Sequence, residues 1–247
     1  MSGGGMMDLS IGVMVPAYNV APHLAGVIAR FPASLWDDIR SVWILDDGST
    51  DTTAVVAAGL ARDNERIVPL SLGHNRGYGE VVRRGLALCR ENRCTHAVCL
   101  HGDGQYPPEE IPRCIDEMQR HRVDILQGSR IASGTALSGG MPLYKYVANR
   151  ALTTIENMVF GLALTDYHSG FLCYSSHALQ SMSFDRLSNS FDFDLEVIAT
   201  ARSLHLSIAE LPIPTRYADE VSYLNPIGYG LRVLRVLVRY LTGRYRP

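Results

Sequence analysis

The segment "CLHGDGQYPPEE", Cys99–Glu110, ends an apolar run and places the carboxylate of Asp103 between Gly102 and Gly104. Such a run indicates a buried strand, and prolines followed by acids indicate the first turn of a helix. A carboxylate on a turn after a strand can hold a hard divalent cation, while the glycines let phosphate groups approach the backbone. Asp-Gly is also ordinary turn chemistry, so this segment alone leaves both interpretations open.

Strand-like and helix-like segments alternate through the first half of the chain. The expected strands cover residues 11–19, 41–51 (running into acidic turn residues), 66–72, 96–100 and 123–129. The expected helices cover residues 22–31, 51–63, 73–92 and 107–122, and Ser49 or Thr50 is the expected N-cap of the second. The alternation predicts an α/β fold, with a mostly parallel sheet and helices on both faces.

Polar clusters follow each of the five expected strands. They are Pro16–Asn19, Asp46–Asp47, His74–Gly79, Asp103–Gln105 and Ser129–Arg130. Open parallel sheets bind ligands where their strands end, so we expect these clusters to form one shared site.

The pattern changes after about residue 130. A loop of small residues precedes an expected helix over 143–162, a strand over 169–175, a helix over 191–204 and a strand over 207–214. We expect a tail over 1–10, one domain over 11–225 and a C-terminal amphipathic helix over 226–247.

Composition excludes several classes of protein. A net charge of −2 gives no basic field for nucleic acid. The five cysteines form no C-x-x-C pair, which favours buried free thiols over disulfides or zinc. Buried free thiols indicate a reducing cytosol, so we expect a cytoplasmic protein, and no apolar run reaches the ~20 residues of a membrane span.

An ordered set of motifs carries a family resemblance: "VPAYN" (15–19), "LDDGSTD" (45–51), "HNRGYGEVVRRG" (74–85), "HGDGQYPPE" (101–109) and "GSR" (128–130). Together they resemble family 2 glycosyltransferases of the GT-A fold, a Rossmann-like α/β fold. The branch that contains dolichol-phosphate mannose synthase and bacterial polyprenyl-phosphate sugar transferases is the most similar. The later segments "SGFLCYS" (169–175), "FDFDLE" (191–196) and "PIPTRYADEVSY" (212–223) also look like that branch.

The resemblance implies a UDP- or GDP-sugar donor, Mn²⁺ or Mg²⁺, and inversion at the anomeric carbon. Asp103 matches the second aspartate of the family's D-x-D, the usual metal ligand, and Gln105 matches a further ligand. Arg130 matches an arginine near the transferred group or the acceptor. The implied donor contacts are Pro16, Ala17, Tyr18 and Asn19 at the nucleoside, Asp46 or Asp47 at the base, and Asn75, Gly77, Gly79, His101 and Gly102 around the diphosphate.

Two positions depart from the family pattern. Val20 follows "PAYN" where a glutamate is frequent, and His101 replaces the first aspartate of D-x-D. An imidazole can ligate Mn²⁺ but suits Mg²⁺ poorly, and it can instead donate a hydrogen bond or simply end the strand. With one carboxylate fewer, we expect the cation to depend on the donor diphosphate for most of its ligand charge.

The acceptor decides which further residues are needed. A hydroxyl acceptor needs a base, for which Asp192, Asp194 and Glu196 are candidates; Asp192 and Glu196 share a helix face while Asp194 points away. A phosphate acceptor needs cations instead, because it is already largely dianionic at neutral pH. The available cations are Arg130, Lys145, Arg150 and Arg216.

The C-terminal helix carries Arg232, Arg235 and Arg239 on one stripe and apolar residues elsewhere. This pattern fits a peripheral helix at the inner face of an anionic membrane, and equally a helix packed on the domain or on a second copy. We therefore predict a glycosyltransferase acting on a polyprenyl phosphate. The alternatives are transfer to a hydroxyl of a soluble metabolite or glycan, and a non-catalytic nucleotide-sugar binding protein. A nucleotidyltransferase is disfavoured, because no lysine follows the first strand.

Overall fold

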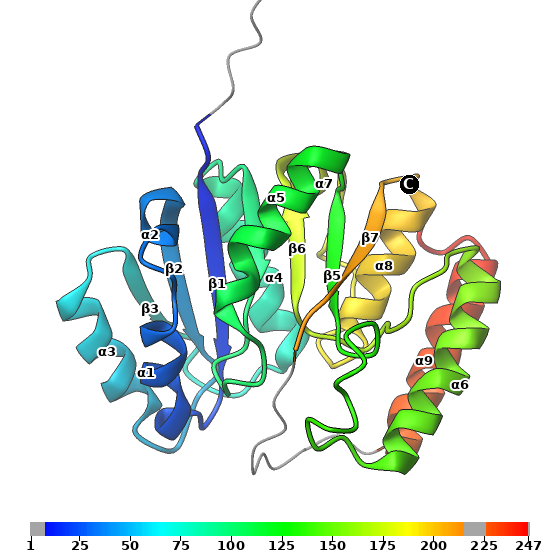
Figure 1. Ribbon diagram of the computed structural model, residues 1–247, viewed down its shortest axis with the longest axis horizontal. Coiled ribbons are helices and arrows are strands. Elements are labelled where there is room, and N and C mark those ends of the chain that lie inside the picture. The colour runs from blue at the N-terminus through cyan, green and yellow to red at the C-terminus, as the bar shows by residue number, and fades with distance from the viewer. Residues whose placement is uncertain (1–7, 215–225, 247) are drawn as a thin grey trace, which may run out of the picture.

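The structure, a computed structural model, describes residues 8–214 and 226–246, which form an α/β fold around one sheet (Figure 1). Its strand order is β3-β2-β1-β4-β6-β5-β7. The strands are β1 (Ile11–Ala17), β2 (Ile39–Asp46), β3 (Ile67–Ser71), β4 (His96–Cys99), β5 (Ile125–Ser129), β6 (Leu172–Ser175) and β7 (Ile208–Pro212). Only β6 pairs antiparallel with its neighbours, so the prediction of a mostly parallel sheet is confirmed.

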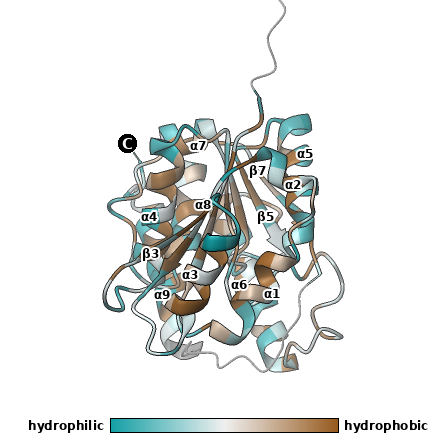
Figure 2. Ribbon diagram, turned by 90° about the vertical axis from the view of Figure 1, so that its left-hand side faces the viewer, coloured by the Kyte–Doolittle hydropathy of each residue, from teal (hydrophilic) through white to brown (hydrophobic). Residues whose placement is uncertain are grey.

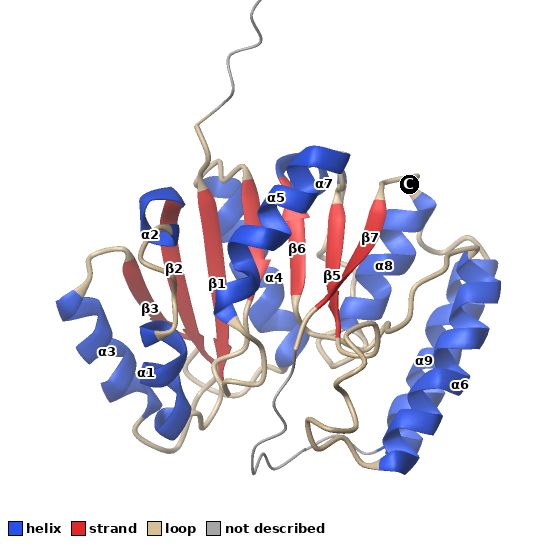
Figure 3. Cartoon of the chain, viewed as in Figure 1, coloured by secondary structure: helices blue, strands red, loops and turns tan. Residues whose placement is uncertain are grey.

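Helices cover both faces of the sheet, as the alternating pattern predicts (Figure 3). They are α1 (Ala21–Ala29), α2 (Leu35–Asp38), α3 (Thr53–Asp63), α4 (Tyr78–Glu91), the 3-10 turn η1 (Pro108–Glu110), α5 (Ile111–His121), α6 (Leu143–Phe160), α7 (Ser176–Ser181), α8 (Phe193–Ser203) and α9 (Pro226–Leu241). The short helices α2 and α7 are absent from the sequence prediction, because four to six residues carry too little periodicity.

Two apolar layers hold the helices on the sheet, and the strands between them are largely hydrophobic (Figure 2). On one face, Val13, Val15 and Ile44 pack against α1 and α5. On the other face, Met14 and Leu45 belong to a cluster that includes α4, α7, α8 and α9. Side chains of one strand alternate between the two faces, so both layers share the same backbone.

The turn before α3 differs from the sequence prediction. Thr52, rather than Ser49 or Thr50, occupies the N-cap position, and it makes no capping hydrogen bond. Asp51 instead accepts hydrogen bonds from the backbone N–H and the hydroxyl of Thr53. The hydroxyl of Ser49 does not cap this helix and instead donates to Asp46 at the end of β2.

Helix α9 packs on the sheet domain through Val233, Val236 and Leu237, which are at most 4% exposed. These three residues belong to the same apolar cluster as α4 and α8. Within the described residues, no helix is long and apolar enough to cross a membrane.

Candidate active site

The ends of β1, β2 and β4 meet at one edge of the sheet, here called the carboxyl edge. Asp47 donates its backbone N–H to the carbonyl of Ala17, and Gly102 donates to the carbonyl of Pro16. The side-chain oxygen of Asn19 accepts from the N–H of Thr50 at 2.8 Å. The predicted clusters Pro16–Asn19 and Asp46–Asp47 are therefore in direct contact, and the cluster Asp103–Gln105 begins directly after Gly102.

The two acids of "LDDGSTD" have different surroundings. Asp47 accepts from the backbone N–H groups of Arg76 at 2.7 Å and Gly77 at 3.1 Å, so both its oxygens hold the turn before α4. Asp46 uses Oδ1 for the N–H and hydroxyl of Ser49. Its Oδ2 has no hydrogen-bond partner among the described residues. Of the two, Asp46 is therefore the acid with an oxygen left for a ligand.

The glycines before and within α4 have a structural cause. Gly77 has φ of 93°, a region that favours glycine. A Cβ at Gly77 or Gly79 would collide with the backbone carbonyl of Asn189 or Ser188. Close approach of the segment before α8 therefore accounts for both residues without a ligand, and Asn75 beside them is exposed.

A chain of polar contacts runs from Asp103 into the protein. Nδ1 of His101 lies 4.0 Å from Oδ2 of Asp103, and Nε2 of His101 lies 3.2 Å from the hydroxyl of Tyr78. That hydroxyl donates to Oδ2 of Asp194 at 2.8 Å. Asp194 is 7% exposed, and its Oδ1 is buried without a hydrogen-bond partner.

The direction of these hydrogen bonds determines the tautomer of His101. When Asp194 is ionised it can only accept, so the Tyr78 proton points to it and the Tyr78 oxygen accepts from Nε2 of His101. Nδ1 then carries a lone pair on the side of Asp103. Burial lowers the pKa of His101, partly offset by the Asp103 charge, which keeps the ring neutral. Burial raises the pKa of Asp194 to about 7.

Asp103 and His101 can supply two ligands to a divalent cation. The Asp103 side chain is 28% exposed, and its Oδ1 also accepts from the N–H of Gln105. Among the described residues, no group of three or more His, Cys, Asp or Glu side chains is arranged to hold a metal. This set fits a cation that is shared with a diphosphate, which supplies the remaining oxygens.

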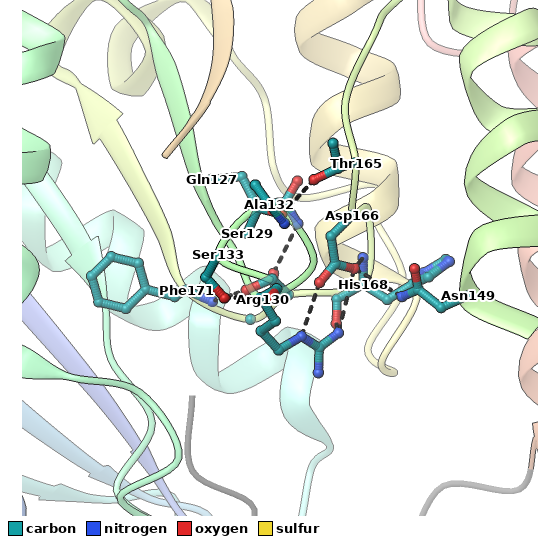
Figure 4. A network of polar contacts seen from close by, with 12 residues as sticks. Gln127, Ser129, Arg130, Ala132, Ser133, Asn149, Thr165, Asp166, His168 and Phe171 are labelled. Carbon is teal, nitrogen blue, oxygen red and sulfur yellow. Dashed lines mark hydrogen bonds and ion pairs between the residues drawn. The ribbon is translucent and has the colours of Figure 1, made fainter. Parts of the chain in front are cut away.

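Arg130, at the end of β5, lies in a buried polar network (Figure 4). Its Nε donates to Asp166 at 2.9 Å and its Nη2 to the carbonyl of His168 at 2.8 Å. Asn149 of α6 donates to the same carboxylate at 2.9 Å. Burial alone would raise the pKa of Asp166, but the Arg130 charge and these hydrogen bonds bring it to about 2. The guanidinium is therefore fixed in place by an ionised carboxylate.

A second buried group links this network to α6 and α9. Glu156 of α6 is fully buried, and neither of its oxygens has a hydrogen-bond partner. Burial and the charge of Asp166 raise the pKa of Glu156 to about 8, and burial lowers the pKa of His168 to about 4. The two side chains, 3.4 Å apart, are therefore both neutral at pH 7. Nδ1 of His168 lies 2.9 Å from the hydroxyl of Tyr229 in α9.

The acids of "FDFDLE" separate as their helical spacing predicts. Asp192 accepts from the Ser188 hydroxyl, and Glu196 accepts from the Ser188 N–H and, through Oε1, from Arg239 of α9 at 2.9 Å. Asp194 faces Tyr78 instead. All three residues are less than 9% exposed.

The predicted acceptor cations have different positions. Lys145 and Arg150 lie on α6, and neither side chain has a hydrogen-bond or ion-pair partner in the described part of the chain. Arg216 lies outside the described residues.

Sequence reasoning missed several residues of the site: Tyr78, Glu156, Asp166 and His168. Tyr78 lies within the quoted "HNRGYGEVVRRG" segment, and Asp166 and His168 directly precede "SGFLCYS". The polar residues Asp166 and His168, just before the expected strand over 169–175, were the sequence feature that could have identified this part of the site.

A known protein family matches more than half of the chain. The profile described as "Glycosyl transferase family 2" matches residues 12–183. The chain belongs to this family. It is therefore a glycosyltransferase, and the family predicted from the ordered motifs is confirmed.

Relatives of this family-2 glycosyltransferase include enzymes that act on lipid phosphates. A UDP-N-acetylglucosamine–dolichyl-phosphate N-acetylglucosaminyltransferase of Methanococcus voltae is 28% identical, over 87% of this chain and 88% of the relative. A polyprenol monophosphomannose synthase of Mycolicibacterium smegmatis is 24% identical, over 81% and 75%. Among solved structures, glucosyl-3-phosphoglycerate synthase of Mycobacterium tuberculosis superposes with a TM-score of 0.71 at 18% identity, over 94% and 80%. That likeness supports the GT-A fold.

Proposed function

We propose that this glycosyltransferase moves a sugar, with inversion, from a UDP- or GDP-sugar to a polyprenyl phosphate with the help of a divalent cation. The observation that carries this choice of acceptor is the guanidinium of Arg130, which Asp166 and the carbonyl of His168 hold in place. An acceptor hydroxyl would need a base at hydrogen-bond distance, whereas a phosphate monoester is already largely dianionic at pH 7. The relatives named for dolichyl and polyprenol phosphates support the same class.

In this proposal Asp103 holds the cation at the donor diphosphate, with His101 as a second ligand through Nδ1. A divalent cation of this kind stabilises negative charge on a departing nucleoside diphosphate. A structure of the mycobacterial glucosyl-3-phosphoglycerate synthase contains Mn²⁺ and UDP, which supports a cation for the fold in general. Gln105 is the remaining predicted ligand, and Asp46, with Oδ2 open, is the proposed contact to the nucleoside.

Arg130 contributes a fixed cationic donor beside the acceptor phosphate, because Asp166 and the carbonyl of His168 hold its guanidinium. Lys145 and Arg150 supply further positive charge from α6. A polyprenyl chain keeps such an acceptor in a membrane, so the reaction takes place at a bilayer surface.

Transfer of a radiolabelled sugar to a matched pair of acceptors tests this function. Each UDP- or GDP-hexose is incubated with Mn²⁺ and either a polyprenyl phosphate or the corresponding polyprenol. We expect product from the phosphate and none from the alcohol, because the alcohol lacks the negative charge that Arg130 would bind. Transfer only to hydroxyl acceptors would instead favour the soluble-acceptor alternative. The complex of the structural neighbour with glucosyl-3-phosphoglycerate makes 3-phosphoglycerate a useful third acceptor.

A further inference from the structure

The hydroxyl of Tyr229, in the first turn of α9, reaches the residues that hold Arg130. It lies 2.9 Å from Nδ1 of His168. The backbone carbonyl of the same histidine accepts from Nη2 of Arg130 at 2.8 Å (Figure 4). Among the described residues, the hydroxyl of Tyr229 has no hydrogen-bond partner besides His168. It can therefore make a further hydrogen bond to a ligand of the site.

The carboxyl group of Glu156 lies at the other ring nitrogen of His168. Its Oε2 is 3.4 Å from Nε2, and neither oxygen of this fully buried side chain has a hydrogen-bond partner in the described chain. A buried polar group without partners lowers stability, so the packing of α6 does not explain why a carboxyl group stands here. Its nearest polar contact, His168, indicates where to look for its role.

A neutral imidazole carries one proton, so the two contacts of His168 depend on each other. When the acid of Glu156 points its proton at Nε2, the ring proton is on Nδ1 and is donated to the oxygen of Tyr229. The proton of Tyr229 is then free for a ligand. When Glu156 offers only lone pairs, the ring proton is on Nε2, and Nδ1 accepts the proton of Tyr229. The hydroxyl then has no proton left to donate.

The surroundings of Glu156 favour the first arrangement at neutral pH. Burial and the charge of Asp166 raise the pKa of Glu156 to about 8, so it keeps its proton. Burial also raises the pKa of Tyr229 and lowers that of His168, so both are neutral. The charged and titratable groups nearby are Asp166, Tyr167 and His168 before β6, Tyr229 on α9, Arg130 paired with Asp166, and Arg202 of α8 on the carbonyl of Phe160.

We propose that Tyr229 donates its hydroxyl proton to the acceptor phosphate at Arg130, and that Glu156 and His168 are positioning residues that keep this proton available. The assignment rests on the proposed function, because it needs an anionic acceptor. A phosphate dianion can only accept, so it binds to the arrangement in which the Tyr229 proton is free. Ionised Glu156 can only accept from Nε2, so the affinity for the acceptor should fall as the pH rises through the pKa of Glu156.

Acceptor kinetics at saturating donor test the contact of Tyr229. Tyr229→Phe should raise the KM for a short-chain, water-soluble polyprenyl phosphate about tenfold at pH 7, because a hydrogen bond to a charged group is lost. The kcat and the KM for the sugar nucleotide should stay within about twofold, since the hydroxyl contacts only the acceptor. Tyr240→Phe is the matched control on the same helix and should behave like the wild type. An acceptor KM that is equal in Tyr229→Phe and the wild type overturns the proposal.

The pH dependence of the same KM distinguishes positioning by Glu156 from structural support. The wild-type acceptor KM should rise several-fold between pH 7 and pH 9, while the phosphate stays dianionic. Glu156→Gln should keep a nearly constant KM, because its amide can donate to Nε2 and cannot ionise. Asp194 is present in both proteins, so its titration cannot produce the difference. A wild-type KM that does not change with pH, or a variant that follows the wild type, contradicts the role of Glu156.

A measurement without turnover distinguishes this inference from the proposed function. Nitrogen NMR of the His168 ring, assigned with His168→Gln, reports which nitrogen carries the proton. We expect the proton to move from Nδ1 to Nε2 between pH 7 and pH 9 in the wild type and to stay on Nδ1 in Glu156→Gln. A tautomer that is independent of pH in the wild type overturns the inference even if transfer occurs. The expected tautomer change without any transfer to polyprenyl phosphate would support the positioning chain and contradict the proposed function instead.

Discussion

The hydroxyl of Tyr78 joins two parts of the site that are distant in the sequence. It lies between His101, two residues before the proposed cation ligand Asp103, and the buried Asp194 of α8. Groups behind a metal ligand fix its tautomer and orientation, and their loss commonly weakens metal binding. The proposed role of His101 as a ligand would therefore depend on Tyr78, which is not itself a proposed ligand.

Tyr78→Phe tests this dependence. The variant removes the acceptor of the Nε2 proton, so the other tautomer becomes accessible and Nδ1 no longer presents a lone pair reliably. We expect about a tenfold higher Mn²⁺ concentration for half-maximal activity, measured at pH 8, where Asp194 is largely ionised. Tyr240→Phe is the control, because its hydroxyl has no hydrogen-bond partner in the described residues. An unchanged Mn²⁺ requirement in Tyr78→Phe would rule out the relay.

Residues such as these mark the limit of prediction from sequence. Asp103 and His101 were recognisable, since a strand end and flanking glycines identify their position. Tyr78 and Asp194 are 116 positions apart, and nothing local to either residue reports the other. The same holds for Arg130 and Asp166, which meet only because β5 and the segment before β6 pack together.

At the scale of elements, α9 is attached by an apolar stripe, by the ion pair between the partly exposed Arg239 and the buried Glu196, and by a longer contact between Arg232 and Asp192. Glu196 of α8 is fully buried, and its Oε1 accepts from Arg239 and from the Tyr245 hydroxyl. The sequence identified the arginine stripe correctly but not its direction, because a helical wheel shows which residues share a face and not what that face contacts.

Arg239→Ala should reduce the free energy of unfolding by about 1–3 kcal/mol, since it leaves a buried carboxylate short of one partner. Its partial exposure keeps the loss below that of a fully buried pair. Arg235→Ala, on the exposed side of the same helix, should change it by less than about 0.5 kcal/mol. Urea unfolding of both variants at pH 7 makes the comparison. Equal effects would show that α9 is held by its apolar contacts alone.

Glu156 makes the contact between α6 and the site dependent on pH. Its pKa in the folded chain is about 8, against an ordinary value of 4.5, so the folded state binds this proton more tightly than the unfolded state. The stability that protonated Glu156 adds to the folded state is therefore fully present below pH 4.5 and is lost as the pH rises toward 8.

Glu156→Gln cannot ionise and should escape this loss. We expect the variant to exceed the wild type in stability at pH 8 by roughly 1–4 kcal/mol, with a difference that shrinks toward pH 5. Denaturant unfolding at several pH values between 5 and 8 measures the difference. A gap that stayed constant with pH would mean that Glu156 does not titrate in this range.

For the whole molecule, the decisive feature is that six of the seven strands run in one direction. Their ends bring together segments from Pro16 to Arg130, which is why clusters that are individually ambiguous could be predicted to form one site. The reversal of β6 and the orientation of α6 and α9 were beyond such reasoning, because both depend on long-range packing. The family assignment needed only the order of the motifs.

The central claim is that a cation on Asp103 joins the chain to a nucleoside diphosphate. Calorimetric titration of UDP and GDP into the wild type and Asp103→Asn, with and without Mn²⁺, tests it most directly. The asparagine keeps an oxygen for the N–H of Gln105, so the turn should persist. We predict that Mn²⁺ tightens binding of one nucleotide by at least about tenfold in the wild type and hardly at all in the variant. An equal effect of Mn²⁺ on both proteins would contradict the account.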